Sequence, residues 1–347
     1  MSLTVAVGCD VGGTKIALGR LDATGSLRDR IQLATPRQDP AAIASRIACY
    51  ARRVAPPGTP VGVAAAGLVR VDGSVAAGSC IHWGGVPLAQ QLRAQLDAPV
   101  CVINDGDAAA WGEHVRRGPG PRPLLMVSVG TGIGGGLVLD HGPYRGAAAM
   151  ALEIGHLIVD RSGPACACGN RGCLQALAGG TAVGQAYSAQ RGLPGEIDAQ
   201  AVVQAAEAGD PLAARVIEEA GLWLGVGLAS VVTILDPAVV VIGGSVACAG
   251  ERLLAPARRA LRIHVFARAH RNIVIEPSQC GSDAALLGAA AAAVTSLPTA
   301  ADHPHESSLR WTGADIPTTP GEDDPRPHRS SLEAGDSRGA ADPRDLR

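Results

Sequence analysis

Short apolar runs alternate with longer helix-forming stretches along most of the chain. The apolar runs are typical of buried strands, and they predict strands at 3–11, 16–22, 60–69, 98–105, 123–130, 135–141 and 238–244. The longer stretches predict helices at 39–54, 87–96, 107–117, 210–235 and 251–264. Strands and helices that alternate in this way indicate an α/β fold built in layers.

The pattern stops near position 297. The remaining segment, 297–347, is rich in Pro, Asp, Arg and Ser and has almost no periodic apolar face. Such a segment cannot bury enough apolar surface to offset its chain entropy, so we predict a disordered tail. The chain of 347 residues is long enough for two domains and a sizeable core, and we place its function within residues 1–296.

Composition and charge argue against several classes of protein. The formal net charge is -2 and no basic stripe occurs, which argues against a nucleic-acid partner. The N-terminus has no positively charged signal region, and the apolar run at 284–294 is too short to span a membrane. We therefore expect a cytoplasmic protein without membrane contact, in which the nine cysteines are thiols and metal ligands rather than a disulfide framework.

Two glycine turns follow predicted strands, about one domain apart. They read Asp10-Val-Gly-Gly-Thr-Lys15 and Gly130-Thr-Gly-Ile-Gly-Gly-Gly136. Glycines let backbone N–H groups approach phosphate oxygens, the Asp10 carboxylate can hold Mg²⁺ through water, and we count Lys15 among the nucleotide-binding candidates. A plain β-hairpin turn explains either one alone. Two of them, each with a threonine, favour two lobes that share one phosphate ligand.

Asp105 and Asp107 stand where a predicted strand gives way to a helix. Either side chain can be the N-cap of that helix, a frequent role of aspartate at such a position. A carboxylate at the carboxyl end of a strand can instead accept a proton from an attacking hydroxyl, as phosphoryl transfer requires. The residues alone leave both interpretations open.

One histidine and three cysteines are crowded together, in the order His156, Cys166, Cys168 and Cys173. Three thiolates and one imidazole complete a closed tetrahedral zinc shell, which marks a structural site. Scattered free thiols or a redox pair are the alternatives, and such crowding in a reducing compartment favours zinc.

Glu153 stands three positions before the histidine of this cluster. If 153–156 forms one helical turn, the two side chains share a face. A His156 bound to zinc through one ring nitrogen can offer the N–H of the other to a hydroxyl, and Glu153 can accept from a neighbouring hydroxyl. This arrangement predicts a polyol site anchored by a metal.

Together these segments resemble the ROK family (repressor, open reading frame, kinase) of sugar kinases, in the hexokinase and actin-like superfamily. The resemblance covers roughly residues 3–296, points to actinobacterial-type glucokinases, and rests on VGCDVGGTKIALG, VINDGDAAAWGE, VSVGTGIGGGLVLD, ALEIGHLIVD, CACGNRGC, VVIGGSV and GSDAALLGAA. It implies a two-lobed actin-like ATPase fold of the ribonuclease H-like type, with a cleft between the lobes and a zinc-braced loop. We place the small lobe at 1–110 with a return helix near 284–296, and the large lobe with the zinc motif at 111–283.

The resemblance also implies roles for single residues. Asp105 matches the catalytic base that deprotonates the primary hydroxyl of the sugar. Sugar ligands match Asn104, Glu153 and His156, and Gln175 occupies the position of a further sugar-binding carboxylate. The nucleotide ligands match Asp10, Gly12, Gly13 and Thr14 in the first turn, Thr131 and Gly132 in the second, and Gly243 and Gly244 near the adenosine.

The implied activity is ATP-dependent phosphorylation of the 6-hydroxyl of a hexose, with glucose as the leading candidate. The implied assembly is a homodimer or homotetramer. ATP, Mg²⁺ and structural Zn²⁺ are the implied cofactors. The chain departs from the family pattern at three places, because Gln175 replaces a glutamate, Cys80 replaces an asparagine and Asp107 replaces an asparagine. These changes affect the sugar pocket and leave the phosphate and zinc motifs intact.

Two alternatives stay open because of these changes: an N-acetylhexosamine kinase acting on ManNAc or GlcNAc, and a non-catalytic sugar sensor of the same fold. A sugar-responsive repressor is disfavoured, since only nine residues precede Asp10 and no basic recognition helix fits there.

Overall fold

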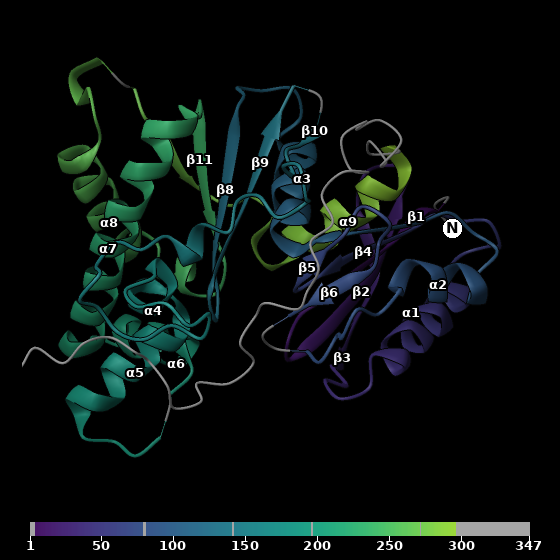
Figure 1. Cartoon of the computed structure of the whole chain (residues 1–347), viewed down its shortest axis with the longest axis horizontal. Coiled ribbons are helices and arrows are strands. Elements are labelled where there is room, and N and C mark those ends of the chain that lie inside the picture. Colours follow the sequence, from purple (N-terminus) through teal and green to yellow (C-terminus); the bar gives the residue numbers. More distant parts are fainter. Residues whose placement is uncertain (1–3, 79–80, 141, 196, 271, 296–347) are drawn as a thin grey trace, which may run out of the picture. The chain divides into compact units, whose positions relative to one another are not determined.

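A five-stranded sheet forms the first part of the fold, in the order β3-β2-β1-β4-β7 (Figure 1). The computed structural model describes residues 4–78, 81–140, 142–195, 197–270 and 272–295. The strands are β1 (Thr4–Val11), β2 (Lys15–Asp22), β3 (Leu27–Ala34), β4 (Val61–Ala65) and β7 (Val100–Asn104). An antiparallel hairpin of β1 and β2 is followed by parallel pairing of β1 with β4 and of β4 with β7.

The second sheet repeats this plan, in the order β10-β9-β8-β11-β12. Its strands are β8 (Leu124–Val129), β9 (Ile133–Leu139), β10 (Gly142–Pro143), β11 (Val239–Gly243) and β12 (Ile275–Pro277). Again an antiparallel hairpin, β8 with β9, is followed by parallel strands, β11 and β12. Each glycine turn found in the sequence closes the hairpin that begins a sheet, and the α/β prediction is confirmed. A small hairpin, β5 (Leu68–Val69) and β6 (Val75–Ala77), lies apart from both sheets.

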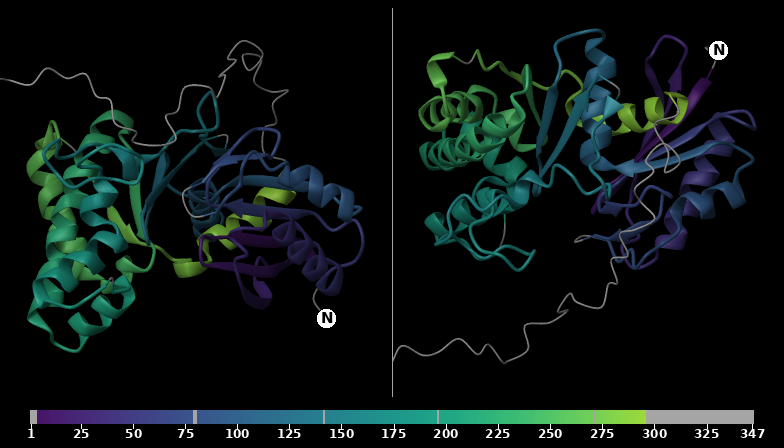
Figure 2. Two further views of the ribbon diagram at one scale, coloured as in Figure 1. Left: turned by 60° about the horizontal axis from the view of Figure 1, so that its bottom comes forward. Right: turned by 45° about the horizontal axis from the view of Figure 1, so that its top comes forward.

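Helices flank these sheets (Figures 1 and 2). They are α1 (Pro40–Val54), α2 (Leu88–Gln95), α3 (Asp105–Arg117), α4 (Leu174–Ala178), α5 (Gly180–Arg191), α6 (Ala199–Glu207), α7 (Pro211–Leu235), α8 (Glu251–His264) and α9 (Ala284–Thr295). Asp39 and Asp210 each cap a helix that has proline in its first turn, as the sequence pattern of those segments requires.

The helix α9 crosses one face of the first sheet beside α3 (Figures 1 and 2). Glycine permits this packing. A Cβ on Gly62 would lie 1.8 Å from the carbonyl oxygen of Ala289, and a Cβ on Gly112 would lie 2.0 Å from that of Ala284. The backbones therefore touch directly, which explains why the chain is rich in Gly and Ala and poor in aromatic residues.

The longest described helix, α7, is apolar over most of its length, although charged residues stand near its start. Its 25 residues have a mean hydropathy of 1.4 in the most apolar window, of which 56% is buried inside the protein. Among the residues that the structure describes it is the one helix long and apolar enough to cross a membrane, and a buried core helix passes the same test. Here α7 packs against α8, α6 and α4, so burial accounts for its composition.

The predicted strands and helices are all present, with shifted boundaries. Segment 60–69 is divided between β4 and β5, and α3 begins at Asp105, two residues earlier than predicted. The sequence analysis missed β3, whose charged and mostly exposed residues are typical of a sheet edge. It also missed the helices α4, α5 and α6 and the short strands β6, β10 and β12. The predicted tail at 297–347 lies outside the described residues.

Candidate active site and metal centre

Two carboxylates lie at the same edge of the first sheet. The parallel register pairs Asp10 with Ala64 and Ala64 with Ile103, so Asp10 at the end of β1 and Asp105 just after β7 lie at the carboxyl ends of their strands. In an open α/β sheet this edge is where ligands bind.

Asn104 positions Asp105. The Asn104 side-chain oxygen accepts from the backbone N–H groups of Gly106 (2.8 Å) and Asp107 (3.3 Å), and its Nδ2 donates to the carbonyl oxygen of Gly67 (3.1 Å). Asn104 is therefore the N-cap of α3, and reading either aspartate as the cap is wrong. Asp105 opens the first turn of α3, and its carboxylate accepts from the Gly106 N–H (3.0 Å) but does not cap the helix. The sugar-binding role of Asn104 stays a prediction.

The carboxylates of this edge share one electrostatic environment. Burial raises the pKa of Asp105 to about 6, helped by the negative charge of Glu153 and opposed by the N–H of Gly106. Burial and the charge of Asp105 raise the pKa of Asp10 to about 7, against the attraction of Lys15. Crowded carboxylates with raised pKa values are typical of catalytic sites, and their oxygen atoms are the ligands that Mg²⁺ prefers.

Asp107 has a partner that sequence reasoning missed. Its buried carboxylate lies 3.4 Å from Nε of Arg145, and Arg145 also donates to the carbonyl oxygen of Val69 (3.2 Å). Burial raises the pKa of Asp107 to about 7, and Arg145 opposes that shift. Arg145 thus links the start of α3, the segment after β10 and the β5–β6 hairpin. The available signal was a basic residue in the stretch between the predicted strand at 135–141 and Glu153.

The first glycine turn is held by side chains from the segment after β3. The Thr35 hydroxyl donates to the carbonyl oxygen of Gly12 (2.7 Å), and its backbone N–H donates to that of Thr14 (3.1 Å). Arg37 donates through Nε to the carbonyl oxygen of Gly13 and through a terminal nitrogen to the Thr14 hydroxyl (3.3 Å). Since C=O and N–H point in opposite directions from one peptide unit, these contacts turn the Thr14 N–H away from Arg37. Neither Thr35 nor Arg37 belongs to a motif, and the sequence analysis missed both.

The second glycine turn is held by backbone groups. The N–H groups of Gly180 and Thr181, at the start of α5, donate to the carbonyl oxygens of Gly130 (2.7 Å) and Thr131 (3.0 Å). The end of β11 reaches the same edge of this sheet, where Gly244 adopts a φ of 94°. A Cβ on Gly244 would lie 2.4 Å from the carbonyl oxygen of Val129, so only glycine fits. The predicted nucleotide residues Thr131, Gly132, Gly243 and Gly244 therefore lie around the ends of β8 and β11.

The four predicted metal ligands are brought together. The ligand atoms of His156, Cys166, Cys168 and Cys173 all lie within 4.8 Å of one another. Nδ1 of His156 is 3.7 Å from Cys166 Sγ, and the sulfur atoms of Cys168 and Cys173 are 3.6 Å apart. Ligands about 2.1–2.3 Å from a tetrahedral zinc ion are about 3.5–3.8 Å apart, so this donor set fits zinc.

The thiols of this cluster shift in opposite directions: hydrogen bonding favours the thiolate form of Cys166, whereas burial and contacts with Cys168 and Cys166 raise the pKa of Cys173 to about 12. Burial opposes ionisation of Cys166, but donors that include the Cys168 backbone and the Gln175 side chain outweigh it and lower the pKa of the thiol to about 6. A thiolate is the form that binds a metal.

Glu153 directly precedes a single 3-10 turn, Ile154–His156. The predicted helical turn is thus present in its tighter form. Because Nδ1 of His156 faces the cysteines, Nε2 is the nitrogen left for another partner. Desolvation raises the pKa of Glu153 and His156 opposes the shift, although part of the Glu153 surface is exposed to solvent. Leu152, just before it, has a φ of 64°, a strained value for a side chain with a Cβ, and such strain is common at functional sites.

Gln175 lies on α4 and faces the metal cluster. Its Nε2 is 3.4 Å from Cys166 Sγ, and its Oε1 lies against Gly132 and Gly155. Cys80 lies outside the described residues.

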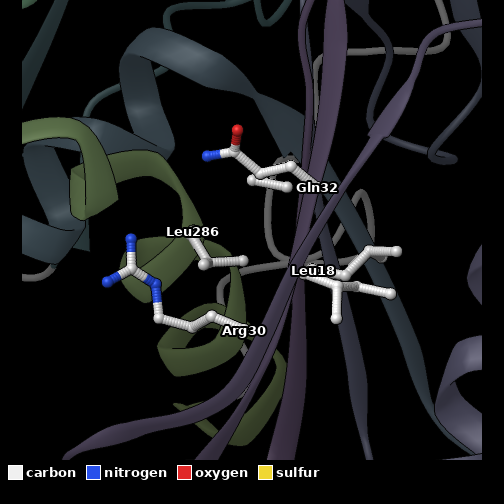
Figure 3. Close-up of a pocket in the computed structure, with 6 residues that line it drawn as sticks. Leu18, Arg30, Gln32 and Leu286 are labelled. Atoms are coloured by element: carbon white, nitrogen blue, oxygen red, sulfur yellow. The ribbon is translucent and has the colours of Figure 1, made fainter.

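A cavity of about 220 Å³ lies elsewhere, between β2, β3 and α9. Figure 3 shows Arg30 and Gln32 reaching from β3 toward α9, with Leu286 between them. Arg30 pairs with Asp283 at the start of that helix. The lining includes neither a glycine turn nor a predicted catalytic carboxylate, so this cavity is separate from the candidate site.

Known proteins resemble the chain over the region that contains these features. The sequence profile of the ROK family matches residues 6–296. The glucokinase of Streptomyces coelicolor is 33% identical over 311 residues, which cover 84% of this chain and 97% of that protein. The N-acetylmannosamine kinase of Yersinia pestis is 35% identical over 298 residues, with 83% and 98% covered.

A solved structure gives the same result. The ROK family glucokinase from Streptomyces griseus, in complex with glucose and AMPPNP, superposes with a TM-score of 0.75 at 30% identity. The match covers 82% of this chain and 98% of that one.

Proposed function

Because the chain belongs to the ROK family, we propose that it transfers the terminal phosphoryl group of ATP to the primary 6-hydroxyl of a hexose, with Asp105 as general base. The observation that carries this proposal is the placement of Asp105. It is a half-buried, largely desolvated carboxylate at the carboxyl end of β7, oriented by the Asn104 cap and close enough to Glu153 for their charges to interact. Its pKa of about 6 leaves it ionised at neutral pH, yet basic enough to accept a proton.

The reaction needs few covalent events. As the sugar oxygen attacks the terminal phosphorus, its proton passes to the Asp105 carboxylate, and the bond from phosphorus to the bridging oxygen breaks to release ADP. The chain mainly positions the reactants and excludes water.

Residues of the two glycine turns would hold the nucleotide. The first turn supplies Gly12, Gly13, Thr14 and Lys15, and the second supplies Thr131 and Gly132. Gly243 and Gly244 would lie near the adenosine. Asp10 would hold Mg²⁺, which supplies positive charge against the transferred phosphoryl group.

Glu153, His156 and Asn104 would bind the sugar. Nε2 of His156 can donate to one hydroxyl while Nδ1 faces the zinc ligands, and Glu153 can accept from a neighbour. Zinc, when bound, would fix the loop that carries both residues and take no part in the transfer.

We further infer that the two sheets belong to separate lobes. The small lobe would comprise 1–110 with 284–296, and the large lobe 111–283. Closure of the lobes over both substrates would keep water from the phosphoryl group. A homodimer or homotetramer and a cytoplasmic location stay predictions.

The choice of hexose is a separate question, because glucokinase and N-acetylmannosamine kinase relatives have similar identities, 33% and 35%. We propose glucose, since a solved glucokinase also superposes well over most of the chain. N-acetylmannosamine is the second candidate because of the Yersinia relatives.

ADP release with glucose, mannose, GlcNAc and ManNAc, each with ATP and Mg²⁺, tests the proposal. We expect the highest kcat/KM for glucose. Turnover of ManNAc alone would favour the second candidate. Sugar binding without turnover of any of the four would contradict the kinase and indicate a sensor.

A further inference from the structure

Gln175 is the second residue after the last cysteine of the metal cluster, and both ends of its side-chain amide contact protein. Nε2 lies 3.4 Å from Cys166 Sγ. A Cβ on Gly132 would come within 2.9 Å of Oε1, and a Cβ on Gly155 within 3.1 Å. The amide is therefore packed between the metal cluster and the second glycine turn.

The N–H···S contact matches the charge of the cluster. A zinc ion with three thiolates and a neutral imidazole carries a formal charge of about -1, and an N–H donor beside a thiolate reduces the cost of that charge. A side-chain amide can donate in this way. A glutamate at the same place has no proton to donate at neutral pH and would add a second negative charge beside the sulfur.

The same helix also carries the backbone contacts of the turn. The short helix α4 holds Gln175 and runs directly into α5, whose first N–H groups donate to the carbonyl oxygens of Gly130 and Thr131. A Cβ on Gly179, between the two helices, would lie 3.3 Å from the carbonyl oxygen of Thr131. The loop that carries the cysteines, the helix α4 and the second glycine turn are therefore connected by direct contacts.

We propose that Gln175 is a positioning residue. Its side-chain N–H donates to the Cys166 thiolate of the metal centre, and its side-chain carbonyl oxygen packs against the Gly130–Gly132 turn and fixes the position of that turn. In this chain the side chain at position 175 contacts the metal centre and the second glycine turn, and it does not bind the sugar. The inference rests on the proposed function, in which zinc braces the site and this turn binds phosphate.

Cobalt binding tests the metal part directly. The full chain, with Co²⁺ in place of zinc, gives a thiolate charge-transfer absorption whose loss during chelator titration reports metal affinity. We expect Gln175→Met, which keeps the shape but lacks the donor, to lower cobalt affinity about 10-fold, and Gln175→Glu to lower it more. Gln190→Glu, an exposed glutamine on α5, is the matched control and should bind cobalt as the native chain does.

Affinity for a non-hydrolysable ATP analogue, measured without sugar, tests the link to the turn. We expect weaker binding in both Gln175 variants and native binding in the control. Circular dichroism identifies the variants that fold. If one of the two Gln175 variants does not fold, the other still tests the proposal.

Native cobalt affinity in a folded Gln175 variant would overturn the proposal. So would a Gln175→Glu variant that retains cobalt and binds a hexose more tightly in calorimetric titration, because the side chain would then be a sugar ligand. Unchanged analogue affinity would overturn the link to the turn. Since neither assay requires turnover, failure of the kinase proposal would be seen separately, as absence of ADP release.

Discussion

The two glycine turns close hairpins of the same topology, but the protein holds them in place by different means. Side chains of Thr35 and Arg37 hold the first turn from one neighbouring loop. The second turn is held by backbone N–H groups of α5 and by Gln175, at the end of a path that begins at the metal cluster. Two turns with similar sequences therefore depend on different parts of the chain.

This difference shows that a phosphate-binding turn is defined by its supports as well as by its glycines. The first turn depends on the half-buried Thr35 and the exposed Arg37, neither of which belongs to a motif. The second depends on a cysteine cluster that is conspicuous in the sequence. Substitutions should therefore affect one turn without affecting the other. A substitution of the base Asp105 should lower turnover while both turns stay intact.

Asp105→Asn should have the largest effect and serves as the reference for both turns. An asparagine cannot accept the hydroxyl proton, so kcat should fall about 10²–10⁴-fold while sugar affinity changes little. Steady-state kinetics and calorimetric titration with the sugar measure the two quantities. Asp198→Asn, at the N-cap of α6, is the control and should keep its kcat. A kcat near native for Asp105→Asn would refute the base.

Cys173→Ser should break the second turn and spare the first. Cys173 is a fully buried member of the cluster, so its loss should release the metal and loosen α4 and the turn. We expect less than one zinc per chain and activity reduced about 100-fold or more. Metal analysis and kinetics check this, with exposed Cys49→Ser on α1 as the control. Full activity without bound metal would show that the cluster is not a brace.

Arg37→Ala should break the first turn and leave the metal in place. Loss of hydrogen bonds from a charged donor costs about 1.5–3 kcal/mol, so KM for ATP should rise about 10–100-fold while the zinc content stays native. Arg46→Ala removes a comparable exposed arginine, which donates to the backbone of Ala34, and should leave KM unchanged. An equal rise in KM for both variants would mean that Arg37 acts only through general charge.

The smallest expected effect is a displaced acid limb in the pH profile. The base must be ionised, and burial raises the pKa of Asp105 to about 6, so kcat/KM for the sugar should fall as the pH drops through about 6. An aspartate with an ordinary pKa would place the acid limb at about pH 4. A limb at that lower value, measured in a stable protein, would contradict a desolvated Asp105 as the base.

Much of the fold could be predicted from the sequence, because buried strands and amphipathic helices leave strong periodic signals. The edge strand β3 was missed because it is mostly exposed and carries charged residues. The helices α5 and α6 were missed because they are short and rich in Ala, so their apolar periodicity is weak. The metal cluster was predictable because its four ligands lie close together in the sequence, and the structure gathers them within 4.8 Å.

The supports of the site were not predictable, since they join segments far apart in the chain. Arg37 meets the first turn across 23 or 24 positions, and Arg145 reaches Val69 across 76. The sequence analysis considered only Asp105 and Asp107 as possible caps of α3, because the strand was expected to run through 105. The strand instead ends at Asn104, and that side chain caps the helix.

Identification of the product tests the central claim most directly. The purified chain is incubated with ATP, Mg²⁺ and glucose or ManNAc, and the mixture is examined by phosphorus NMR and mass spectrometry. We predict one ADP for each hexose 6-phosphate formed. Inorganic phosphate with unmodified sugar, or phosphate on another hydroxyl, would contradict the account.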